Sequence, residues 1–273
     1  MTESAAMPSP CLRQRARRLL GPLLRRVIPS HLPMKGPYRS YGAALADATG
    51  YDSPLVTQQV KDATLAVLEG RAAYERDGVA FQDRPDLAIH GVLGQVLTPS
   101  ATIADFGGGL GGLYINAPEL FPQGCRRLVI EQASMVAAGQ SLASAHGLAI
   151  EFFNGSDLRA IPSVDVLVLS GVLQYLADPW PLIDGLLHQL KPASVIVDRT
   201  SIKRGPSRWY LQTNPGYYKE PVTYPMQVLE RRRLLAAFPG YHPVCQWHNA
   251  FDAERPEHIG ILLLRDDAAG TKG

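Results

Sequence analysis

The fold of this chain is decided by the stretch Ile103-Ala104-Asp105-Phe106-Gly107-Gly108-Gly109-Leu110-Gly111-Gly112. Apolar residues lead up to Asp105 and glycines follow at once, which is typical of a buried strand that turns sharply into a helix. Glycine permits the positive φ of such a turn and, because it has no Cβ, lets a ligand approach the backbone. A helix over 110–120 would direct unpaired amide groups toward that ligand. The stretch therefore predicts a nucleotide-type binding site.

Two glycine templates fit this turn. Gly107, Gly109 and Gly112 satisfy the G-x-G-x-x-G fingerprint of dinucleotide-binding folds. Asp105 followed by Gly107, Gly109 and Gly111 instead resembles the D-x-G-x-G-x-G signature of S-adenosylmethionine (SAM) methyltransferases. Glycine-rich turns also serve simply to reverse a chain, so the choice between templates depends on the sequence that follows.

Further apolar runs, each ending in polar residues, follow the glycine turn. The run 128–131 ends in Glu131 about 20 residues after the glycines, where an open α/β sheet places a ribose-binding carboxylate. Three later runs, 149–157, 164–170 and 194–200, have the same form. Ligands of parallel sheets bind at the carboxyl ends of the strands, so the terminal polar residues are expected to converge. They are Asp105, Glu131, Asp157, Ser170 and Asp198.

Strands that alternate with helices predict an α/β fold with a doubly wound, mostly parallel, seven-stranded Rossmann-like sheet. The last two strand candidates, 241–248 and 258–264, are separated by a short polar loop, which indicates an antiparallel hairpin at the sheet edge. Only one mononucleotide-type half fits after residue 107, whereas a dinucleotide fold needs two. Both features favour SAM over NAD.

Composition excludes several classes of protein. The chain has 273 residues, of which 46% are hydrophobic and 19% charged, with a net charge of +2. This balance predicts no nucleic-acid binding. Cys11, Cys125 and Cys245 form no pair or metal-ligand spacing, so we expect reduced thiols, no metal and a cytoplasmic location. No apolar run approaches the length of a membrane span, and nothing in the sequence indicates an oligomeric state.

The N-terminus carries a concentration of positive charge. Leucines and arginines interleave over residues 11–28 at helical spacing, interrupted by Gly21-Pro22. One interpretation is a surface helix that lies on anionic lipid at the inner face of the membrane. The other is a solvated basic arm, or a helix packed on its own domain, since Gly-Pro kinks a helix. Peripheral membrane contact through residues 11–28 is therefore one of two open alternatives.

Several stretches together resemble a family of bacterial SAM-dependent methyltransferases whose members are often linked with surface-polysaccharide biosynthesis. The resemblance spans about residues 38–265 and implies a class I fold that uses SAM, but it does not fix the acceptor. The matching stretches are Tyr74-Glu75-Arg76-Asp77, Asp105-Phe106-Gly107-Gly108-Gly109-Leu110-Gly111, Glu131-Gln132, Val172-Leu173-Gln174-Tyr175-Leu176 with Asp178-Pro179, and Asp198-Arg199-Thr200.

The resemblance also implies roles for individual residues. Asp105 with Gly107, Gly108, Gly109 and Gly111 would hold the methionine portion of SAM. Glu131 would bind the ribose hydroxyls, and Gln132 follows it where a stacking apolar residue is expected. The adenine would lie against Ser156 and Asp157. The residues that would line the pocket near the sulfonium are Ser170, Gly171 and Gln174. Independently of the resemblance, the segment ahead of the first strand can cap the pocket, and its candidates to face SAM are Tyr74, Arg76 and Phe81, with a surface salt bridge as the alternative for Arg76.

We expect three segments: a basic arm over 1–35, a helical cap or lid over 36–98, and the SAM-dependent methyltransferase domain over 99–267. Within the last, residues 202–225 are predicted to form a long aromatic loop. Such a loop suits ring recognition at a pocket mouth or a cover packed on the core. A helix is expected over 226–238.

Methyl transfer from a sulfonium is an in-line displacement, so much of catalysis can come from positioning. A hydroxyl acceptor benefits from a general base. Asp198 is the first candidate and His248 the second, although a capping carboxylate and an edge-strand histidine are equally good interpretations. The prediction is O-methylation of a sugar, a glycan or a related small molecule. The alternatives are a natural-product methyltransferase, an NAD(P)-dependent oxidoreductase and a non-catalytic SAM-binding protein.

Overall fold

The computed structural model describes residues 34–49, 54–214, 222–248 and 257–266. Twelve strands alternate with helices and short 3-10 turns along this part of the chain. The strands are β1 (Met34–Tyr38), β2 (Tyr74–Arg76), β3 (Val79–Phe81), β4 (Thr102–Phe106), β5 (Arg126–Glu131), β6 (Ile150–Asn154), β7 (Val166–Ser170), β8 (Ser194–Lys203), β9 (Arg208–Asn214), β10 (Val222–Glu230), β11 (Tyr241–His248) and β12 (Glu257–Arg265). The helices are α2 (Tyr41–Ala46), α3 (Pro54–Leu68), α4 (Ala88–Val96), α5 (Gly112–Asn116), α6 (Ala133–His146), α7 (Pro179–Leu190) and α8 (Arg231–Ala236), and the 3-10 turns are η1 (Pro118–Leu120), η2 (Leu158–Ala160) and η3 (Leu173–Tyr175).

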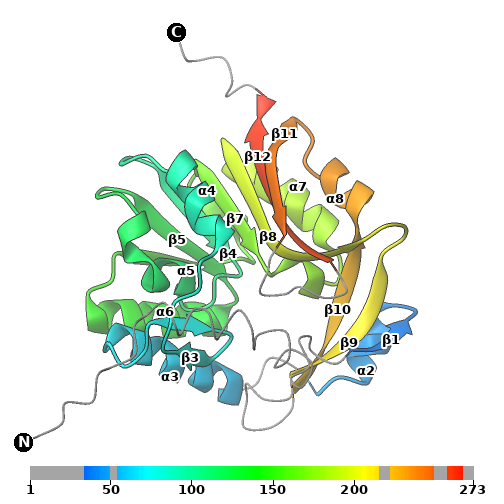
Figure 1. Cartoon of the computed structure of the whole chain (residues 1–273), viewed down its shortest axis with the longest axis horizontal. Coiled ribbons are helices and arrows are strands. Elements are labelled where there is room, and N and C mark those ends of the chain that lie inside the picture. The colour runs from blue at the N-terminus through cyan, green and yellow to red at the C-terminus, as the bar shows by residue number, and fades with distance from the viewer. Residues whose placement is uncertain (1–33, 50–53, 215–221, 249–256, 267–273) are drawn as a thin grey trace, which may run out of the picture.

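The central sheet has the strand order β6-β5-β4-β7-β8-β12-β11 (Figure 1). The five strands from β6 to β8 are parallel, and β12 runs antiparallel to both of its neighbours. The α/β fold with a mostly parallel sheet and an antiparallel edge hairpin is therefore confirmed. Strands such as β7 are buried on both faces, which explains their continuous aliphatic sequences.

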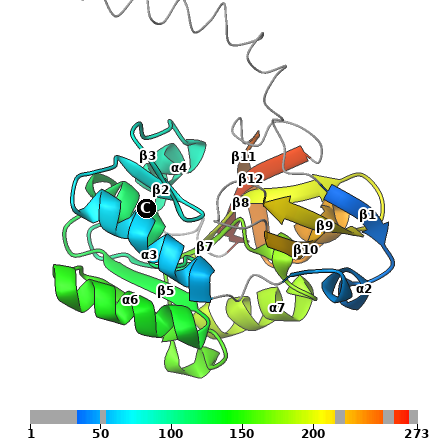
Figure 2. The same ribbon diagram turned by 90° about the horizontal axis from the view of Figure 1, so that it is seen from below.

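Two apolar clusters sandwich the sheet. One face packs against α3, α4, α5 and α6, through residues such as Val60, Leu93 and Tyr114. The other packs against α7 and α8, through residues such as Leu186 and Leu234. Helices cover both faces, as a doubly wound sheet requires; Figure 2 shows α3 and α6 together on one side and α7 on the other.

The alternation of side chains along each strand decides which polar strand ends meet. Residues two apart point to the same face of a sheet. Ile103, Val129, Val168 and Ile196 belong to the α3–α6 face. The side chains two positions further along these strands therefore leave the sheet on that same face, namely Asp105, Glu131, Ser170 and Asp198.

A second, smaller sheet departs from the expected architecture. Strand β8 continues beyond the end of β7 to Lys203, where β10 pairs with it, and β10, β9 and β1 form an antiparallel sheet. The described parts of 202–225 are thus mostly strand, so the prediction of a long loop is wrong there. The predicted helix over 226–238 is also wrong at its start, because β10 runs to Glu230 and α8 occupies only Arg231–Ala236.

The segment expected to be a helical cap contains strands as well. β1 joins the small sheet, and β2 and β3 form a hairpin over a stretch for which no strand was predicted. The helix expected over 110–120 is only Gly112–Asn116, because Pro118 follows within two residues and begins a 3-10 turn. Residues 1–33 of the expected basic arm, with the amphipathic stretch 11–28, lie outside the described residues. Among those described, no helix is both long and apolar enough to cross a membrane.

Candidate functional site

The glycine turn after β4 is held tightly on two sides and left open on a third. Gly107, Gly109 and Gly111 all have positive φ, at 75°, 58° and 89°. A Cβ on Gly107 would lie 2.6 Å from a methyl group of Val172, and one on Gly108 would lie 2.6 Å from Asp105 Oδ2. A Cβ on Gly109 would meet nothing within 4 Å. The turn is therefore packed against Asp105 of β4 and against Val172, which follows β7, while Gly109 faces open space.

Glu131, at the end of β5, lies against this turn. Its Oε1 accepts a hydrogen bond from Gly109 N at 3.2 Å, and its Oε2 accepts one from Gln132 N at 2.8 Å. Burial raises the pKa of Glu131, while these two amide donors oppose that rise. Each carboxylate oxygen has a second lone pair, so the group can still accept from two neighbouring hydroxyls. This is the chemistry that a ribose diol requires.

Asp105, at the end of β4, is an acid held away from water. Its residue is 5% exposed, and burial raises its pKa to about 7, assisted by the negative charges of Glu131 and Asp198 and opposed by Arg199. No hydrogen-bond donor of the described chain contacts its carboxylate. A buried carboxylate without donors is costly, so this group favours a cationic or donor ligand.

Asp198, on β8, is equally buried but fully hydrogen-bonded. Ser170 Oγ donates to Oδ2 at 2.9 Å, and Trp247 Nε1 donates to Oδ1 at 3.0 Å. Trp247 belongs to β11 and reaches Asp198 across β12, where its ring lies directly over Gly260. Any Cβ at Gly260 would fall 1.9 Å from that ring. Three strands therefore cooperate to fix this carboxylate.

Arg199 brings the positive charge of the site. It has a left-handed backbone conformation, with φ of 48°, which is uncommon for a residue other than glycine. Its guanidinium packs over Gly171, where a Cβ would lie 2.6 Å from Nη2. Gln174 Nε2 donates to the Arg199 carbonyl at 3.0 Å. Arg199, Gly171 and Gln174 thus form one unit beside Ser170, and this unit's charge lowers the pKa of Asp105.

The β2–β3 hairpin contributes buried polar residues from the N-terminal segment. Tyr74 is buried, and burial raises the pKa of its hydroxyl. Arg76 is half-buried and forms an ion pair with Asp77 at 3.4 Å. Glu75 is 8% exposed, and burial raises its pKa to about 7. The charge of Arg199 acts on both Tyr74 and Glu75, so the hairpin lies next to the strand ends.

Two further predicted residues follow β6. Ser156 and Asp157 are exposed, and Asp157 Oδ1 accepts a hydrogen bond from Arg159 N at 3.2 Å, which caps η2. The backbone of this segment is tied to β5, because Gly155 N donates to the Glu131 carbonyl at 2.9 Å. The exposed Gln132 lies on the β5 side of the same connection. Gln132, Ser156 and Asp157 are therefore all exposed on segments that are connected to Glu131.

His248 is not brought together with the others. On β11 it neighbours Trp247, so its side chain leaves the opposite face of the sheet from the one that carries Asp198. Its side chain is 68% exposed and contacts Glu257, with Nδ1 3.2 Å from Oε1. The sequence pattern could not distinguish the two faces of an edge strand.

Sequence reasoning missed three residues of the site as candidates. Arg199 and Glu75 lie inside stretches that the family resemblance includes, so their position was a usable signal. Trp247 is 49 positions from Asp198, and no local pattern links the two.

The small sheet presents an aromatic and amide surface to η3. Tyr175 OH donates to Gln212 Oε1 at 3.2 Å, and the Tyr175 and Tyr224 rings meet edge to face at 5.4 Å. Gln212 and Tyr224 are directly opposed in β9 and β10, so both leave the same face. The other face carries Trp209, which packs on Tyr41 of α2. The Tyr175–Gln212–Tyr224 cluster is thus directed toward the turn after β7.

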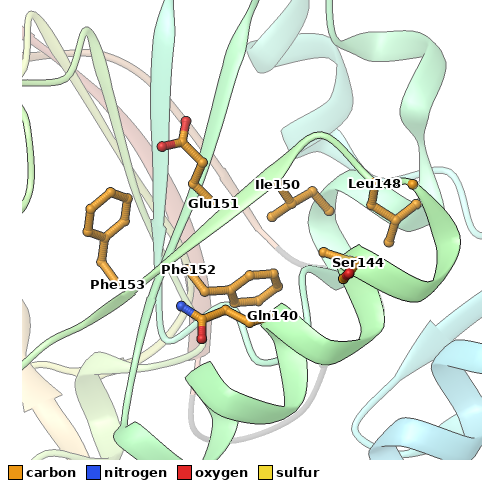
Figure 3. A pocket seen from close by; sticks show the side chains of 9 residues that line it. Gln140, Ser144, Leu148, Ile150, Glu151, Phe152 and Phe153 are labelled. Atoms are coloured by element: carbon orange, nitrogen blue, oxygen red, sulfur yellow. The ribbon is translucent and has the colours of Figure 1, made fainter.

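A cavity of about 580 Å³ lies elsewhere, between α6 and the edge strand β6 (Figure 3). Ile150 and Phe152 point toward α6, beside Gln140 and Ser144, while Phe153 leaves β6 on the other side. None of the strand-end residues lines this cavity, so it is separate from the candidate site. No group of three or more potential metal ligands occurs within the described ranges.

Comparison with known proteins gives structural matches alone. No protein-family model matches the chain, and no curated protein matches it. A similar solved structure is the glycopeptide N-methyltransferase MtfA complexed with SAM, with TM-score 0.45 and 15% identity over 65% of this chain and 93% of that chain. The Burkholderia thailandensis 1,6-didemethyltoxoflavin-N1-methyltransferase, with bound 1,6-didemethyltoxoflavin and S-adenosylhomocysteine (SAH), has TM-score 0.46 and 16% identity, covering 85% and 93%. The N-terminal domain of EvdMO1, in the presence of SAH and D-fucose, has TM-score 0.44 and 14% identity, covering 77% and 94%.

Proposed function

We propose that this protein is a SAM-dependent methyltransferase. The observation that carries the proposal is the contact between Glu131 and the glycine turn, with the partnerless carboxylate of Asp105 directly beneath that turn. Glu131 can accept hydrogen bonds from a diol, the turn is open at Gly109, and Asp105 is a desolvated acid, and these three features follow one another along β5 and β4. This arrangement matches a ligand that joins a ribose to a cationic amino acid.

In this proposal, different residues bind different parts of SAM. Glu131 accepts from the ribose hydroxyls, with Gln132, Ser156 and Asp157 beside the adenine. The open turn at Gly109 admits the methionine portion over Asp105. The planar guanidinium of Arg199 suits the carboxylate of the methionine portion, because a guanidinium and a carboxylate can form two parallel hydrogen bonds. In this proposal the residues that border the methionine portion and the methyl group are Tyr74, Arg76, Gly107, Gly108, Gly111, Ser170, Gly171 and Gln174.

When bound, SAM supplies an electrophilic methyl group on a sulfonium. The chain's own contribution is to hold the acceptor in line and to take its proton. Ser170 Oγ, which is already hydrogen-bonded to Asp198 Oδ2, can accept a proton from an incoming hydroxyl while passing its own to that carboxylate. Trp247 keeps the carboxylate in place throughout. Asp198 therefore acts as the base through Ser170, and His248 is not needed.

The acceptor in this proposal is a hydroxyl of a sugar, a glycan or a related small molecule. Tyr175 and Tyr224 contribute aromatic rings beside the turn after β7, and the amide oxygen of Gln212 orients the Tyr175 hydroxyl. Aromatic planes with an adjacent amide suit a hydroxylated ring. A natural-product acceptor fits the same surface, and a nitrogen acceptor would make the Ser170–Asp198 relay unnecessary. The link with surface polysaccharides, a cytoplasmic location and lipid contact through residues 11–28 remain predictions from the sequence.

The sheet order argues against an NAD(P)-dependent oxidoreductase. After β8 the chain forms the antiparallel β12–β11 pair instead of a second parallel half. A dinucleotide-binding fold has a second parallel half at this point of the chain, which binds the second nucleotide. The structure therefore supports a mononucleoside ligand.

Calorimetric titration with SAM, SAH and NADH tests the proposal. We expect binding of SAM and SAH and none of NADH. Labelled SAM, offered with a panel of sugars and glycan intermediates, then tests turnover and separates an enzyme from a SAM-binding scaffold. Ser170→Ala should lower turnover at least tenfold. Binding of NADH in preference to SAM would overturn the proposal.

A further inference from the structure

The β2–β3 hairpin is fastened to the helix that follows the glycine turn. The side-chain amide of Asn116, at the end of α5, makes two hydrogen bonds to the backbone of Glu75. Glu75 N donates to Asn116 Oδ1 at 2.8 Å, and Asn116 Nδ2 donates to the Glu75 carbonyl at 2.8 Å. Both residues are buried. This pair of bonds fixes the backbone position from which the Glu75 side chain extends.

The Glu75 carboxylate lies on the glycine turn. Its Oε2 would be 3.0 Å from a Cβ placed on Gly112, the first residue of α5. Its Oε1 accepts one hydrogen bond, from Gly78 N at 3.1 Å within the hairpin. In the part of the chain that the structure describes, no cation forms an ion pair with this carboxylate. An acid that is 8% exposed thus has a single backbone donor.

The charges around the turn do not balance. Asp105, Glu131 and Glu75 approach it from β4, β5 and the hairpin, and Arg199 is the cation whose field reaches both Asp105 and Glu75. Burial raises the pKa of Glu75 to about 7, the charge of Asp77 adds to that rise, and Gly78 N and Arg199 oppose it. Buried carboxylates are stabilised by a cation that supplies hydrogen-bond donors. A ligand that brings an ammonium group to the turn would meet this need.

We propose that Glu75 is a cofactor-binding residue, whose carboxylate binds the α-ammonium group of the amino-acid portion of SAM from the side opposite Asp105. The inference rests on the proposed function, and it assigns to the N-terminal hairpin a direct part in that site. Asn116 is the positioning residue that holds Glu75 in place. The hairpin is then half of the amino-acid subsite and not merely a cover over the sheet.

Binding of three related ligands tests this assignment. SAM and SAH carry the amino-acid portion, whereas 5′-methylthioadenosine lacks it and keeps the nucleoside. Glu75→Gln preserves the shape and the acceptor for Gly78 N but removes the charge. We expect calorimetry to give an affinity for SAM and SAH about tenfold weaker in Glu75→Gln, the loss expected for a charge-assisted hydrogen bond. The affinity for 5′-methylthioadenosine should not change.

A matched control lies two residues away on the same hairpin. Asp77 is exposed and has a positive φ of 52°, which asparagine tolerates well. Asp77→Asn removes a charge whose ion pair is with Arg76 and not with the turn, so SAM affinity should fall less than in Glu75→Gln. Glu75→Asp keeps the charge but withdraws it by one methylene, and its SAM affinity should fall between those of wild type and Glu75→Gln.

Each outcome decides the matter. Unchanged SAM affinity in Glu75→Gln would overturn the assignment and leave the proposed function standing. An equal loss for 5′-methylthioadenosine would also overturn it, because Glu75 would then only maintain the shape of the site. If Glu75→Gln does not fold, SAM affinity of Glu75→Asp equal to that of wild type overturns it, and a selective loss supports it. Wild-type protein that binds neither SAM nor SAH would overturn the proposed function, and this inference with it.

Discussion

Asp105 lies near the end of β4, and Asp198 lies within β8, level with the end of β7. Both leave the sheet on the same face and are almost equally buried, at 5% and 3% exposed. Their surroundings differ completely. Asp198 accepts hydrogen bonds from Ser170 and Trp247, whereas no donor of the described chain contacts Asp105. On the β8 side of the site, defined by Asp198, Ser170 and Trp247, the protein itself satisfies the carboxylate. On the β4 side, defined by Asp105 and the glycine turn, it does not. Position at this edge of the parallel strands alone does not tell a structural carboxylate from one that awaits a ligand.

Glycines create this difference on both sides. Gly260 leaves room on β12 for the Trp247 ring to pass over and reach Asp198. Gly108 lets the turn close down on Asp105, which excludes water and supplies no donor in exchange. At Gly260 the close approach allows Asp198 to gain a hydrogen bond. At Gly108 it keeps hydrogen-bond donors away from Asp105. Burial without hydrogen bonds is unfavourable, so the β4 side gives up stability that a bound cation can restore.

The largest expected effect is on the free energy of unfolding, and it comes from disrupting the contact between Trp247 and Asp198 on the β8 side. Gly260→Ala places a methyl group where the Trp247 ring lies, so the ring must move and Asp198 loses its Oδ1 donor. We expect the free energy of unfolding to fall by about 2–4 kcal/mol, the range for overpacking combined with an unsatisfied buried acceptor. Urea denaturation measures it. Gly94→Ala in α4, where a Cβ meets nothing within 4 Å, is the control and should be neutral or stabilising. A loss below 1 kcal/mol at Gly260 would mean that Trp247 does not depend on the space above it.

The next effect concerns the β4 side and depends on pH. Burial raises the pKa of Asp105 to about 7 in the folded protein, from an ordinary value of 3.8. Because the folded state binds this proton more tightly, it is favoured at low pH and loses that advantage as the pH rises from about 4 to 7. Asp105→Asn removes the titration. Between pH 5 and 8 the ligand-free wild type should therefore lose about 2–3 kcal/mol relative to Asp105→Asn.

Urea denaturation of both proteins across this pH range provides the measurement. Glu75 titrates in the same direction but is present in both proteins, so the comparison isolates Asp105. Asp105→Asn should also weaken SAM binding at least tenfold. A stability difference that does not change with pH would show that Asp105 is ionised throughout and already has a partner.

Much of this architecture could be predicted from local patterns. The aliphatic runs that end at Asp105, Glu131, Ser170 and Asp198 predict the parallel strands, and period-2 alternation places all four side chains on one face. The small sheet could not be predicted, because β9 pairs with β1, more than 170 residues earlier in the chain. Its aromatic residues were therefore interpreted as a loop. One of the two donors to Asp198 could not be predicted for the same reason, since Trp247 reaches it across an intervening strand.

The smallest effect separates stability from binding at Asp198. Trp247→Phe keeps an aromatic side chain at this position of β11 and removes the N–H that donates to Asp198 Oδ1. We expect a loss of about 1–2 kcal/mol in the free energy of unfolding, because the acceptor is left buried and unpaired. SAM affinity should stay within twofold, since the β4 side is untouched. The same calorimetric and urea experiments measure both quantities, with Trp180→Phe as a matched control. Trp180 packs against Arg233 on the opposite face of the sheet, far from either carboxylate. If Trp247→Phe instead weakened SAM binding as strongly as Asp105→Asn does, the two sides would act as one unit, and Asp198 would belong to the ligand as much as Asp105 does.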